Sequence, residues 1–199
     1  SDRPASLWAM IAEACGRSAD GEALICGGVR LSWRQAADRA ARIAAGFRKL
    51  GLQRGDRVAI LLGNRIEFPL LLFAAAHEGL VTVLLSTRQQ KPEIAYVLTD
   101  CGAKLLVHEA ALADRLPDAR DVPDLKHRIA VDDTARSQFA SLRGNPSVPE
   151  PAKVGEDDTA MILYTSGTTG KPKGAMLAHC TIIHSSVVFV SCLKLTEKD

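Results

Sequence analysis

Short apolar stretches alternate with longer amphipathic stretches along this 199-residue chain, and this alternation constrains the fold more than any other feature. Residues 57–62, RVAILL, form a continuous apolar run typical of a buried strand, and residues 81–85 form another. A segment of helical length, residues 66–77, separates them. Because parallel strands need long crossover connections, the alternation predicts an α/β fold with a mainly parallel sheet flanked by helices.

The same patterns predict the remaining elements. In chain order these are a helix over 5–15, strands over 23–26 and 29–31, a helix that begins near Pro92 and reaches Thr99, a strand over 104–108, a helix over 110–116, and strands over 128–131 and 160–164.

The helix that follows Ser32 has the clearest signals at both ends. Ser32 and Gln35 have the spacing of a capping box. Gly51 stands where a helix commonly ends on a left-handed residue. Between them, apolar residues recur at helical spacing and form one face: Ala36, Ala37, Ala40, Ile43, Ala44 and Phe47.

Residues 132–158 lack this regularity. They contain Pro146, Pro149 and Pro151, many charges and little apolar periodicity. The segment is predicted to be a surface loop or linker, and it carries no recognisable chemistry.

Charge and hydropathy exclude two classes of partner. The 25 basic and 23 acidic residues are interspersed and give a net charge of +2, so no nucleic-acid footprint is expected. The longest strongly apolar stretch, residues 69–76, is far shorter than the ~20 residues of a spanning helix, so no membrane span is expected.

The cysteines indicate a reducing compartment. There are five, widely scattered and without a Cys-x-x-Cys pair. This argues against a disulfide framework and against a zinc site, and we expect a cytoplasmic protein.

Residues 164–174 are the segment that carries chemistry, and they are predicted to form a phosphate-binding loop. Its glycines allow positive φ and close approach of a ligand to the main chain. Its hydroxyl groups donate hydrogen bonds and its lysines supply positive charge, which together suit a polyphosphate. The candidate residues are Thr165, Ser166, Gly167, Thr168, Thr169, Gly170, Lys171 and Lys173.

This loop differs from the P-loop of the common nucleotide hydrolases. That motif has glycine five positions before its Gly-Lys pair, where this chain has Thr165, and Ser or Thr after the lysine, where this chain has Pro172. Apolar residues follow the loop at 175–178, so we expect a strand–loop–strand arrangement with no helix N-terminus facing the phosphates.

The segment YTSGTTGKPKGAMLAH resembles the phosphate-binding signature of the adenylate-forming (AMP-binding) superfamily, and is most like that of acyl- and aryl-CoA synthetases. Residues 55–68 (GDRVAILLGNRIEF) and 84–107 (LLSTRQQKPEIAYVLTDCGAKLLV) resemble the family's upstream blocks. The signature is specific, whereas the upstream blocks only support it.

The resemblance implies a two-step reaction in which a carboxylic acid and ATP give an acyl-adenylate and pyrophosphate. A thiol, usually that of coenzyme A, then takes the acyl group, as in fatty acid metabolism. It also implies that residues 165–169 and Lys173 contact ATP, while Lys171 lies at a variable family position. Thr165 is a candidate for the shell of a Mg²⁺ ion bound with the phosphates.

Several other residues are of types that often act in catalysis or metal binding, but the sequence gives them no such role. Arg88 matches a recurrent family arginine, for which we expect a structural ion pair. His179 and His184 lie five apart on a predicted helix, a spacing that does not place two metal ligands on one face. Tyr164 is expected to pack beside the loop, and Trp8 and Trp33 to be core or interface aromatics.

By the resemblance, residues 1–199 are the N-terminal portion of an AMP-binding domain, part of the large N-terminal domain of such a synthetase. The C-terminal domain, the catalytic lysine, the ribose-binding aspartate and the Mg²⁺-binding glutamate are expected to lie beyond residue 199, so we expect the chain alone to be inactive. Two alternatives remain open: an adenylation domain of a peptide synthetase, and a truncated nucleotide-binding remnant without turnover. The sequence leaves open which acid is used and the oligomeric state.

Overall fold

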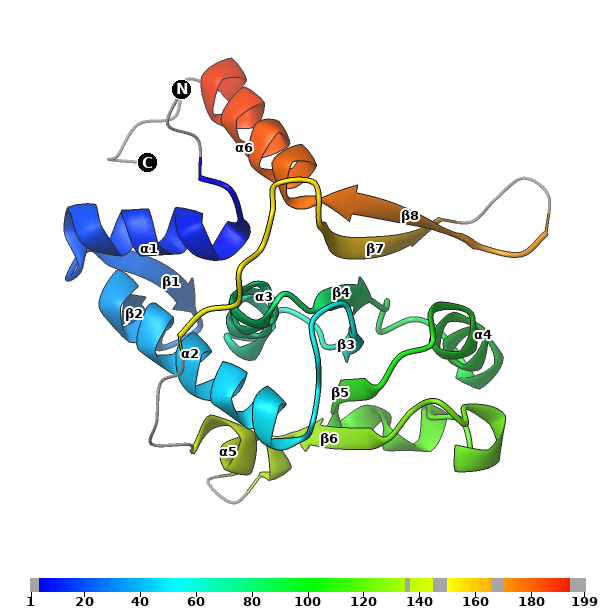
Figure 1. Ribbon diagram of the computed structural model, residues 1–199. Helices are drawn as coiled ribbons and strands as arrows, with labels where there is room; N and C mark the ends of the chain where they lie inside the picture. Colours follow the sequence, from blue (N-terminus) through cyan, green and yellow to red (C-terminus); the bar gives the residue numbers. More distant parts are fainter. Residues whose placement is uncertain (1–3, 135–136, 145–149, 166–169, 194–199) are drawn as a thin grey trace.

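A six-stranded sheet with the order β6-β5-β3-β4-β7-β8 organises the computed structural model, which describes residues 4–134, 137–144, 150–165 and 170–193 (Figure 1). The strands are β3 (Arg57–Leu61), β4 (Val81–Leu84), β5 (Leu105–Glu109), β6 (His127–Val131), β7 (Thr159–Thr165) and β8 (Lys173–Ala178). β3 to β7 run parallel, and β8 pairs antiparallel with β7. The predicted α/β class with a mainly parallel, helix-flanked sheet is confirmed.

Helices cover both faces of this sheet (Figure 1). One face carries α2 (Trp33–Lys49), α3 (Glu67–Glu78) and α5 (Gln138–Arg143), with α1 (Leu7–Ser18) packed on α2 and α3. The other face carries α4 (Lys91–Cys101) and the 3-10 segments η1 (Ala110–Arg115) and η2 (Ala119–Asp121). A separate hairpin consists of β1 (Glu22–Cys26) and β2 (Val29–Ser32), and α6 (His179–Leu193) follows β8.

The side chains of β3 are buried against the helices on both faces of the sheet. Val58 and Ile60 are fully buried in the cluster that contains α2 and α3, while Ala59 and Leu61 are buried in the cluster that contains α4. Side chains alternate across a strand, so a strand covered on both faces has a continuous rather than an alternating apolar sequence.

The helix after Ser32 has the predicted ends. Ser32 Oγ accepts a hydrogen bond from the backbone of Gln35, and Gln35 Oε1 accepts one from the backbone of Ser32 at 2.9 Å. Gly51 follows the helix with φ +80°. The predicted helix over 110–116 is instead the 3-10 segment η1. It ends before Leu116, because Leu116 adopts the extended conformation that a residue before proline prefers.

The predicted loop over residues 132–158 is wrong in its first half. α5 lies there, N-capped by Ser137, and its Phe139 and Leu142 are each only 3% exposed. The helix has six residues, too few for its apolar pair to show as a period. Residues 150–155 then belong to no helix or strand, and residues 156–158 form a turn before β7. Ala152 donates its N–H to the carbonyl of His77 at 2.8 Å.

The contact between α2 and α5 gives a first prediction. A Cβ added at Gly46 would lie 2.6 Å from the carbonyl oxygen of Leu142 and 2.7 Å from its Cδ1. Gly46→Ala is therefore expected to lower the free energy of unfolding by about 1–3 kcal/mol, although alanine favours helices, because the helices must separate. Urea unfolding measures this. Gly16→Ala in α1, where an added Cβ meets nothing within 4 Å, is the control and is expected to be neutral or stabilising; equal effects of both changes would contradict the packing.

Candidate functional site

The predicted phosphate-binding loop connects β7 to β8. The hairpin pairs Thr165 with Lys173 and Tyr164 with Gly174 at the root of the loop, which confirms the strand–loop–strand arrangement. The loop follows the carboxyl end of a parallel strand, the edge at which open α/β sheets bind ligands. Of the candidate residues, Thr165, Gly170, Lys171 and Lys173 are described; Ser166, Gly167, Thr168 and Thr169 lie outside the described residues.

Two glycines give this hairpin its shape. Gly170 has φ +113°, a conformation that residues with a side chain rarely adopt. A Cβ at Gly174 would lie 2.9 Å from Ile162 Cγ2 and 3.0 Å from Tyr164 Cζ. The backbone of β8 therefore approaches the side chains of β7 closely only because residue 174 is glycine.

Among the described residues, no carboxylate neutralises the positive charge at the loop. Lys171 and Lys173 are both exposed, and neither pairs with a carboxylate among the described residues. The Lys171 ammonium lies 5.6 Å from the centroid of the Tyr96 ring, within the range of a cation–π contact. Two unpaired cations beside a glycine-rich turn attract an anion.

Helix α4 supports both limbs of the hairpin. Tyr96 donates from its hydroxyl to the carbonyl of Pro172 at 3.0 Å, and Tyr164 donates to Asp100 Oδ2 at 2.6 Å. Burial and the hydrogen bond to Asp100 raise the pKa of Tyr164, which therefore remains a neutral donor. Tyr164 thus packs beside the loop, as expected. Sequence reasoning missed Tyr96 and Asp100, because nothing in the sequence links α4 to a loop some 75 residues away.

The opposite end of the hairpin is held by His179. Its side chain is 1% exposed, and its Nδ1 accepts the backbone N–H of Leu7 at 3.2 Å. Its backbone N–H donates to the carbonyl of Asp158 at 3.1 Å, and the Asp158 carboxylate accepts hydrogen bonds from Gly155 and Arg54. His179 is therefore a structural residue that joins the start of α1 to the turn before β7.

This arrangement predicts an acid sensitivity. Burial lowers the pKa of His179, although the nearby Asp158 charge opposes the effect. The unfolded chain, whose histidines titrate near about 6.5, then binds the proton first as pH falls. Stability is expected to drop from about pH 6.5 downward, because protonation at Nδ1 also removes the acceptor for Leu7.

His179→Asn tests this expectation, since the amide oxygen can replace Nδ1 as acceptor without titrating. The free energy of unfolding measured at pH 7 and pH 5 should fall more in the wild type than in the variant. Burial also lowers the pKa of His108, but this histidine is common to both proteins. An identical pH dependence in the two proteins would show that His179 is not the titrating group.

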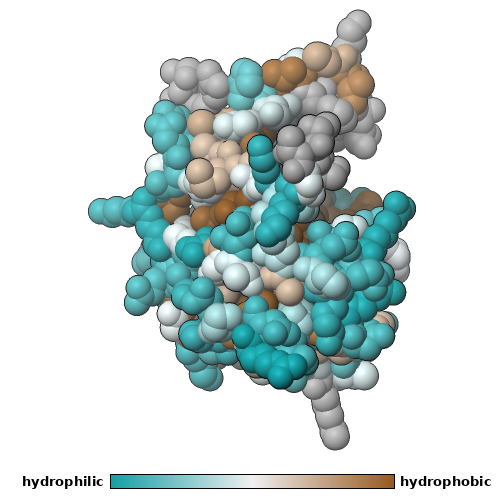
Figure 2. All heavy atoms as spheres, turned by 90° about the vertical axis from the view of Figure 1, so that its right-hand side faces the viewer, coloured by the Kyte–Doolittle hydropathy of each residue, from teal (hydrophilic) through white to brown (hydrophobic). Residues whose placement is uncertain are grey.

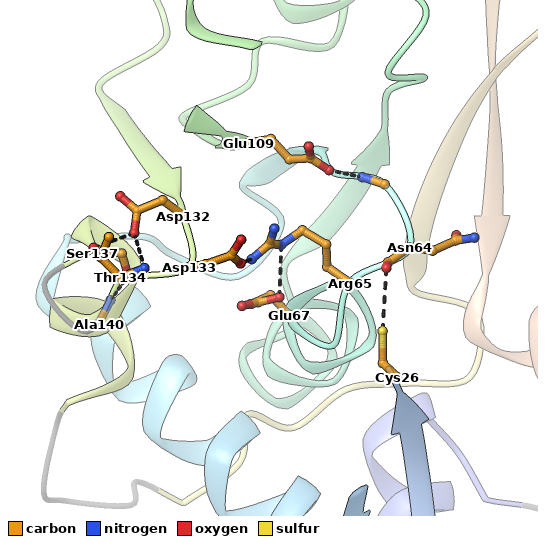
Figure 3. A network of polar contacts seen from close by, with 11 residues as sticks. Cys26, Asn64, Arg65, Glu67, Glu109, Asp132, Asp133, Thr134, Ser137 and Ala140 are labelled. Carbon is orange, nitrogen blue, oxygen red and sulfur yellow. Dashed lines mark hydrogen bonds and ion pairs between the residues drawn. The ribbon is translucent and has the colours of Figure 1, made fainter. Parts of the chain in front are cut away.

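At the carboxyl ends of β3, β5 and β6, polar side chains form ion pairs and hydrogen bonds with neighbouring groups of the protein (Figure 3). Arg65 pairs with Glu67 at 3.3 Å and with Asp133 at 2.7 Å, and the Glu109 carboxylate accepts the N–H of Gly63 at 2.7 Å. Arg65 and Glu109 therefore have polar partners within the protein, whereas the two lysines after β7 have no carboxylate partner among the described residues.

Arg88 lies on the connection after β4, the strand beside β7. Its side chain is exposed, and its backbone N–H donates to Ser86 Oγ at 3.3 Å. Within the described part of the chain it makes no ion pair, so the expected structural pairing is not found.

A hollow of about 540 Å³ lies along the β7–β8 face and is lined by Arg54, Asp100, Ile162, Tyr164 and Met176, among others. Figure 2 shows hydrophobic residues at the level of the hairpin and α6, above a mostly hydrophilic body. Met176 is 72% exposed, and Val187, Val188, Val190 and Leu193 of α6 are also exposed. Of residues 164–174, Tyr164 and Gly174 line the hollow, whereas Lys171 and Lys173 are not among its lining residues.

Two kinds of feature are absent from residues 4–134, 137–144, 150–165 and 170–193. No helix there combines the length and the apolar character needed to cross a membrane. No three or more His, Cys, Asp or Glu side chains gather there in a way that could hold a metal ion. His184 is exposed.

Known proteins resemble this chain in sequence and in fold. Residues 11–199 match the family model described as AMP-binding enzyme. The long-chain-fatty-acid–CoA ligase FadD13 of Mycobacterium tuberculosis is 33% identical over 86% of this chain, the feruloyl-CoA synthase of an Amycolatopsis species is 36% identical over 77%, and the fatty acid–[acyl-carrier-protein] ligase ScoC of Streptomyces coeruleorubidus is 34% identical over 79%.

The chain spans about a third of the length of these relatives: 34%, 29% and 30% respectively. Among solved structures, the inhibitor-bound N-terminal domain of FACL13 from Mycobacterium tuberculosis superposes with a TM-score of 0.79 at 33% identity. That match covers 88% of this chain and 44% of the other.

Proposed function

The chain belongs to the AMP-binding enzyme family, and from this membership we propose that it supplies the ATP-phosphate site of an enzyme that activates a carboxylic acid. In the proposed first step, a carboxylate oxygen attacks the α-phosphorus of ATP. The bond from the α-phosphorus to the bridging oxygen breaks, giving an acyl-adenylate and pyrophosphate. In the second step, a thiol attacks the acyl carbonyl carbon, loses its proton, and displaces AMP.

The observation that carries this proposal is the pair of exposed lysines, without a carboxylate partner among the described residues, beside a glycine of positive φ at the carboxyl end of β7. Negative charge grows on the departing pyrophosphate. Donors fixed near that group stabilise the transition state more than the ground state. We assign the stabilisation of the pyrophosphate charge to Lys173 and to the hydroxyl groups of Thr165, Ser166, Thr168 and Thr169. We assign a smaller contribution to Lys171.

The described residues fit a magnesium–nucleotide complex better than a separate metal ion. Thr165 offers a neutral hydroxyl at the end of β7, and no acidic cluster lies among the described residues. Mg²⁺ keeps most of its ligands as waters and substrate phosphates, so one hydroxyl group suffices from this part of the protein. When bound, the ion would offset phosphate charge, and Thr165 would be its contact here.

For the second step we propose coenzyme A as the acceptor, in line with the names of the first two relatives. The name of the third relative specifies an acyl-carrier protein, and this similarity keeps a carrier-protein acceptor as the alternative. The chain's five free cysteines suit a reducing compartment such as the cytoplasm. We further propose that residues 1–199 alone bind nucleotide without completing the reaction.

ATP–pyrophosphate exchange over a panel of aliphatic and aromatic acids tests the proposal. The chain should be compared with a polypeptide in which it is continued to the length of its relatives. We expect acid-dependent exchange by the longer protein and none by the chain alone. A folded longer protein that stays silent across the panel with Mg²⁺ present would favour a binding role without turnover.

A further inference from the structure

The contacts at the root of the loop single out a residue that the phosphate-binding motif does not contain. We propose that Tyr96 is a positioning residue, which holds the returning limb of the loop and thereby places Lys171 and Lys173 for the ATP phosphates. This inference rests on the proposed function for its effect on ATP, although the contact itself does not.

Tyr96 makes two contacts with the returning limb. Its hydroxyl donates to the Pro172 carbonyl at 3.0 Å, and the centroid of its ring lies 5.6 Å from the Lys171 ammonium. The ring also meets that of Tyr164 edge-on, with centroids 6.4 Å apart. Tyr96 therefore contacts β7 and the segment leading into β8.

The position of Tyr96 on α4 explains why it can fix the loop. Asp100 lies one helical turn further along the same face and binds Tyr164 of β7, so a single helix face holds both limbs of the hairpin. α4 is itself well anchored, since Ile94, Val97 and Leu98 are at most 1% exposed. Its start is fixed by a capping box between Gln90 and Glu93.

A segment that contains glycines, here Gly170 and Gly174, has more accessible backbone conformations than one without them. Ordering it around a polyphosphate costs conformational entropy, and a fixed attachment at residue 172 lowers that cost before the ligand arrives. Loss of Tyr96 should therefore weaken ATP binding and leave binding of the carboxylic acid unchanged.

Two variants separate the two contacts. Tyr96→Phe removes only the hydroxyl and is expected to raise KM for ATP about fivefold in the exchange reaction of the longer protein. Tyr96→Leu also removes the ring, and an increase of roughly 20-fold is expected. KM for the acid should stay within about twofold in both, which a general loss of folding would not produce.

Thr99→Ala is the matched control on the same helix. It removes a hydroxyl that donates to the Asp121 carbonyl at 3.3 Å, in η2 rather than in the hairpin. KM for ATP should remain within about twofold of the wild type. Unchanged KM values for ATP in both Tyr96 variants, in a protein that performs exchange, would overturn the positioning role.

A second measurement needs no activity. Trypsin can cut the 199-residue chain after Lys173, and mass spectrometry follows the rate of that cut relative to cuts elsewhere. Weaker attachment of Pro172 should expose this bond more often, so Tyr96→Phe should raise the rate about fivefold and Thr99→Ala should not.

The two measurements distinguish failure of the inference from failure of the proposed function. If the Tyr96 variants are cut faster but the longer wild-type protein performs no exchange, the contact between Tyr96 and Pro172 is supported and its proposed role in ATP binding is not. An unchanged rate of cleavage after Lys173 would overturn the attachment of Pro172 to Tyr96, whether or not the longer protein performs exchange.

Discussion

Lys173→Ala is expected to lower kcat/KM for ATP about 100-fold in ATP–pyrophosphate exchange, because it removes one fixed cation from the site where charge develops on pyrophosphate. Lys173 opens β8 directly opposite Thr165, and its side chain is exposed without a described carboxylate partner. Its removal should therefore leave the free energy of unfolding nearly unchanged. Steady-state kinetics on the longer protein give the effect on catalysis.

Lys171→Ala is the control for this prediction. The Lys171 ammonium lies over the Tyr96 ring rather than beside Thr165, so its loss should cost only about fivefold. If Lys171→Ala were the more damaging change, the assignment of the two lysines would be reversed. If neither change mattered in an active enzyme, the loop would not be the phosphate site.

Glu78→Ala is expected to lower the free energy of unfolding by about 2 kcal/mol, because it leaves the buried His77 side chain without its partner and removes the ion pair of the half-exposed Arg48. Glu78 is 7% exposed; it accepts from Arg48 at 2.5 Å and from His77 Nδ1 at 2.7 Å. Arg48 also donates to the carbonyl of Glu150. The contact therefore joins α2, α3 and the segment that leads to β7.

The control for Glu78 is an exposed ion pair. Glu22→Ala removes the partner of Arg30, and its side chain is 48% exposed, so a loss of at most about 0.5 kcal/mol is expected. Chemical denaturation of both variants measures the difference. A Glu78→Ala variant as stable as Glu22→Ala would contradict the structural role given to this carboxylate.

The same carboxylate gives a pH dependence with a definite sign. Burial raises the pKa of Glu78, but the hydrogen bonds from His77 and Arg48 outweigh burial and hold the pKa below its ordinary value. Its contribution to stability is then complete above the unfolded pKa of about 4.3 and is lost as pH falls through the folded value. The gap in stability between wild type and Glu78→Ala should shrink from pH 5 towards pH 3.

Local patterns predicted the central part of the fold. The apolar run before Leu62 and the capping box at Ser32 are short-range signals, and both elements are present as expected. α5 escaped prediction because six residues with one apolar pair do not show a period, although Phe139 and Leu142 belong to the core. Tertiary contacts override weak local signals in such segments.

One part of the candidate site could likewise be predicted from the local sequence, and another part could not. The glycines, hydroxyls and lysines of the loop lie consecutively in the sequence, so their chemistry could be read directly from it. Tyr96, Asp100 and His179 support the hairpin through contacts between distant segments. Only the arrangement of the sheet and α4 brings Tyr96 and Asp100 to the hairpin. His179 directly follows β8, but its partner Leu7 is distant in the sequence, and no local pattern encodes these contacts.

The most direct test of the central claim is a titration of the isotope-labelled 199-residue chain with Mg²⁺·ATP, followed by NMR of its backbone amides. We expect progressive, saturable shifts at Thr165, Gly170, Lys171 and Lys173. No shifts are expected at Gly27, in the turn between β1 and β2. Shifts that spare the loop at saturating nucleotide, or that gather at the closed ends of β3 and β5, would contradict the assignment of residues 164–174 as the ATP-phosphate site.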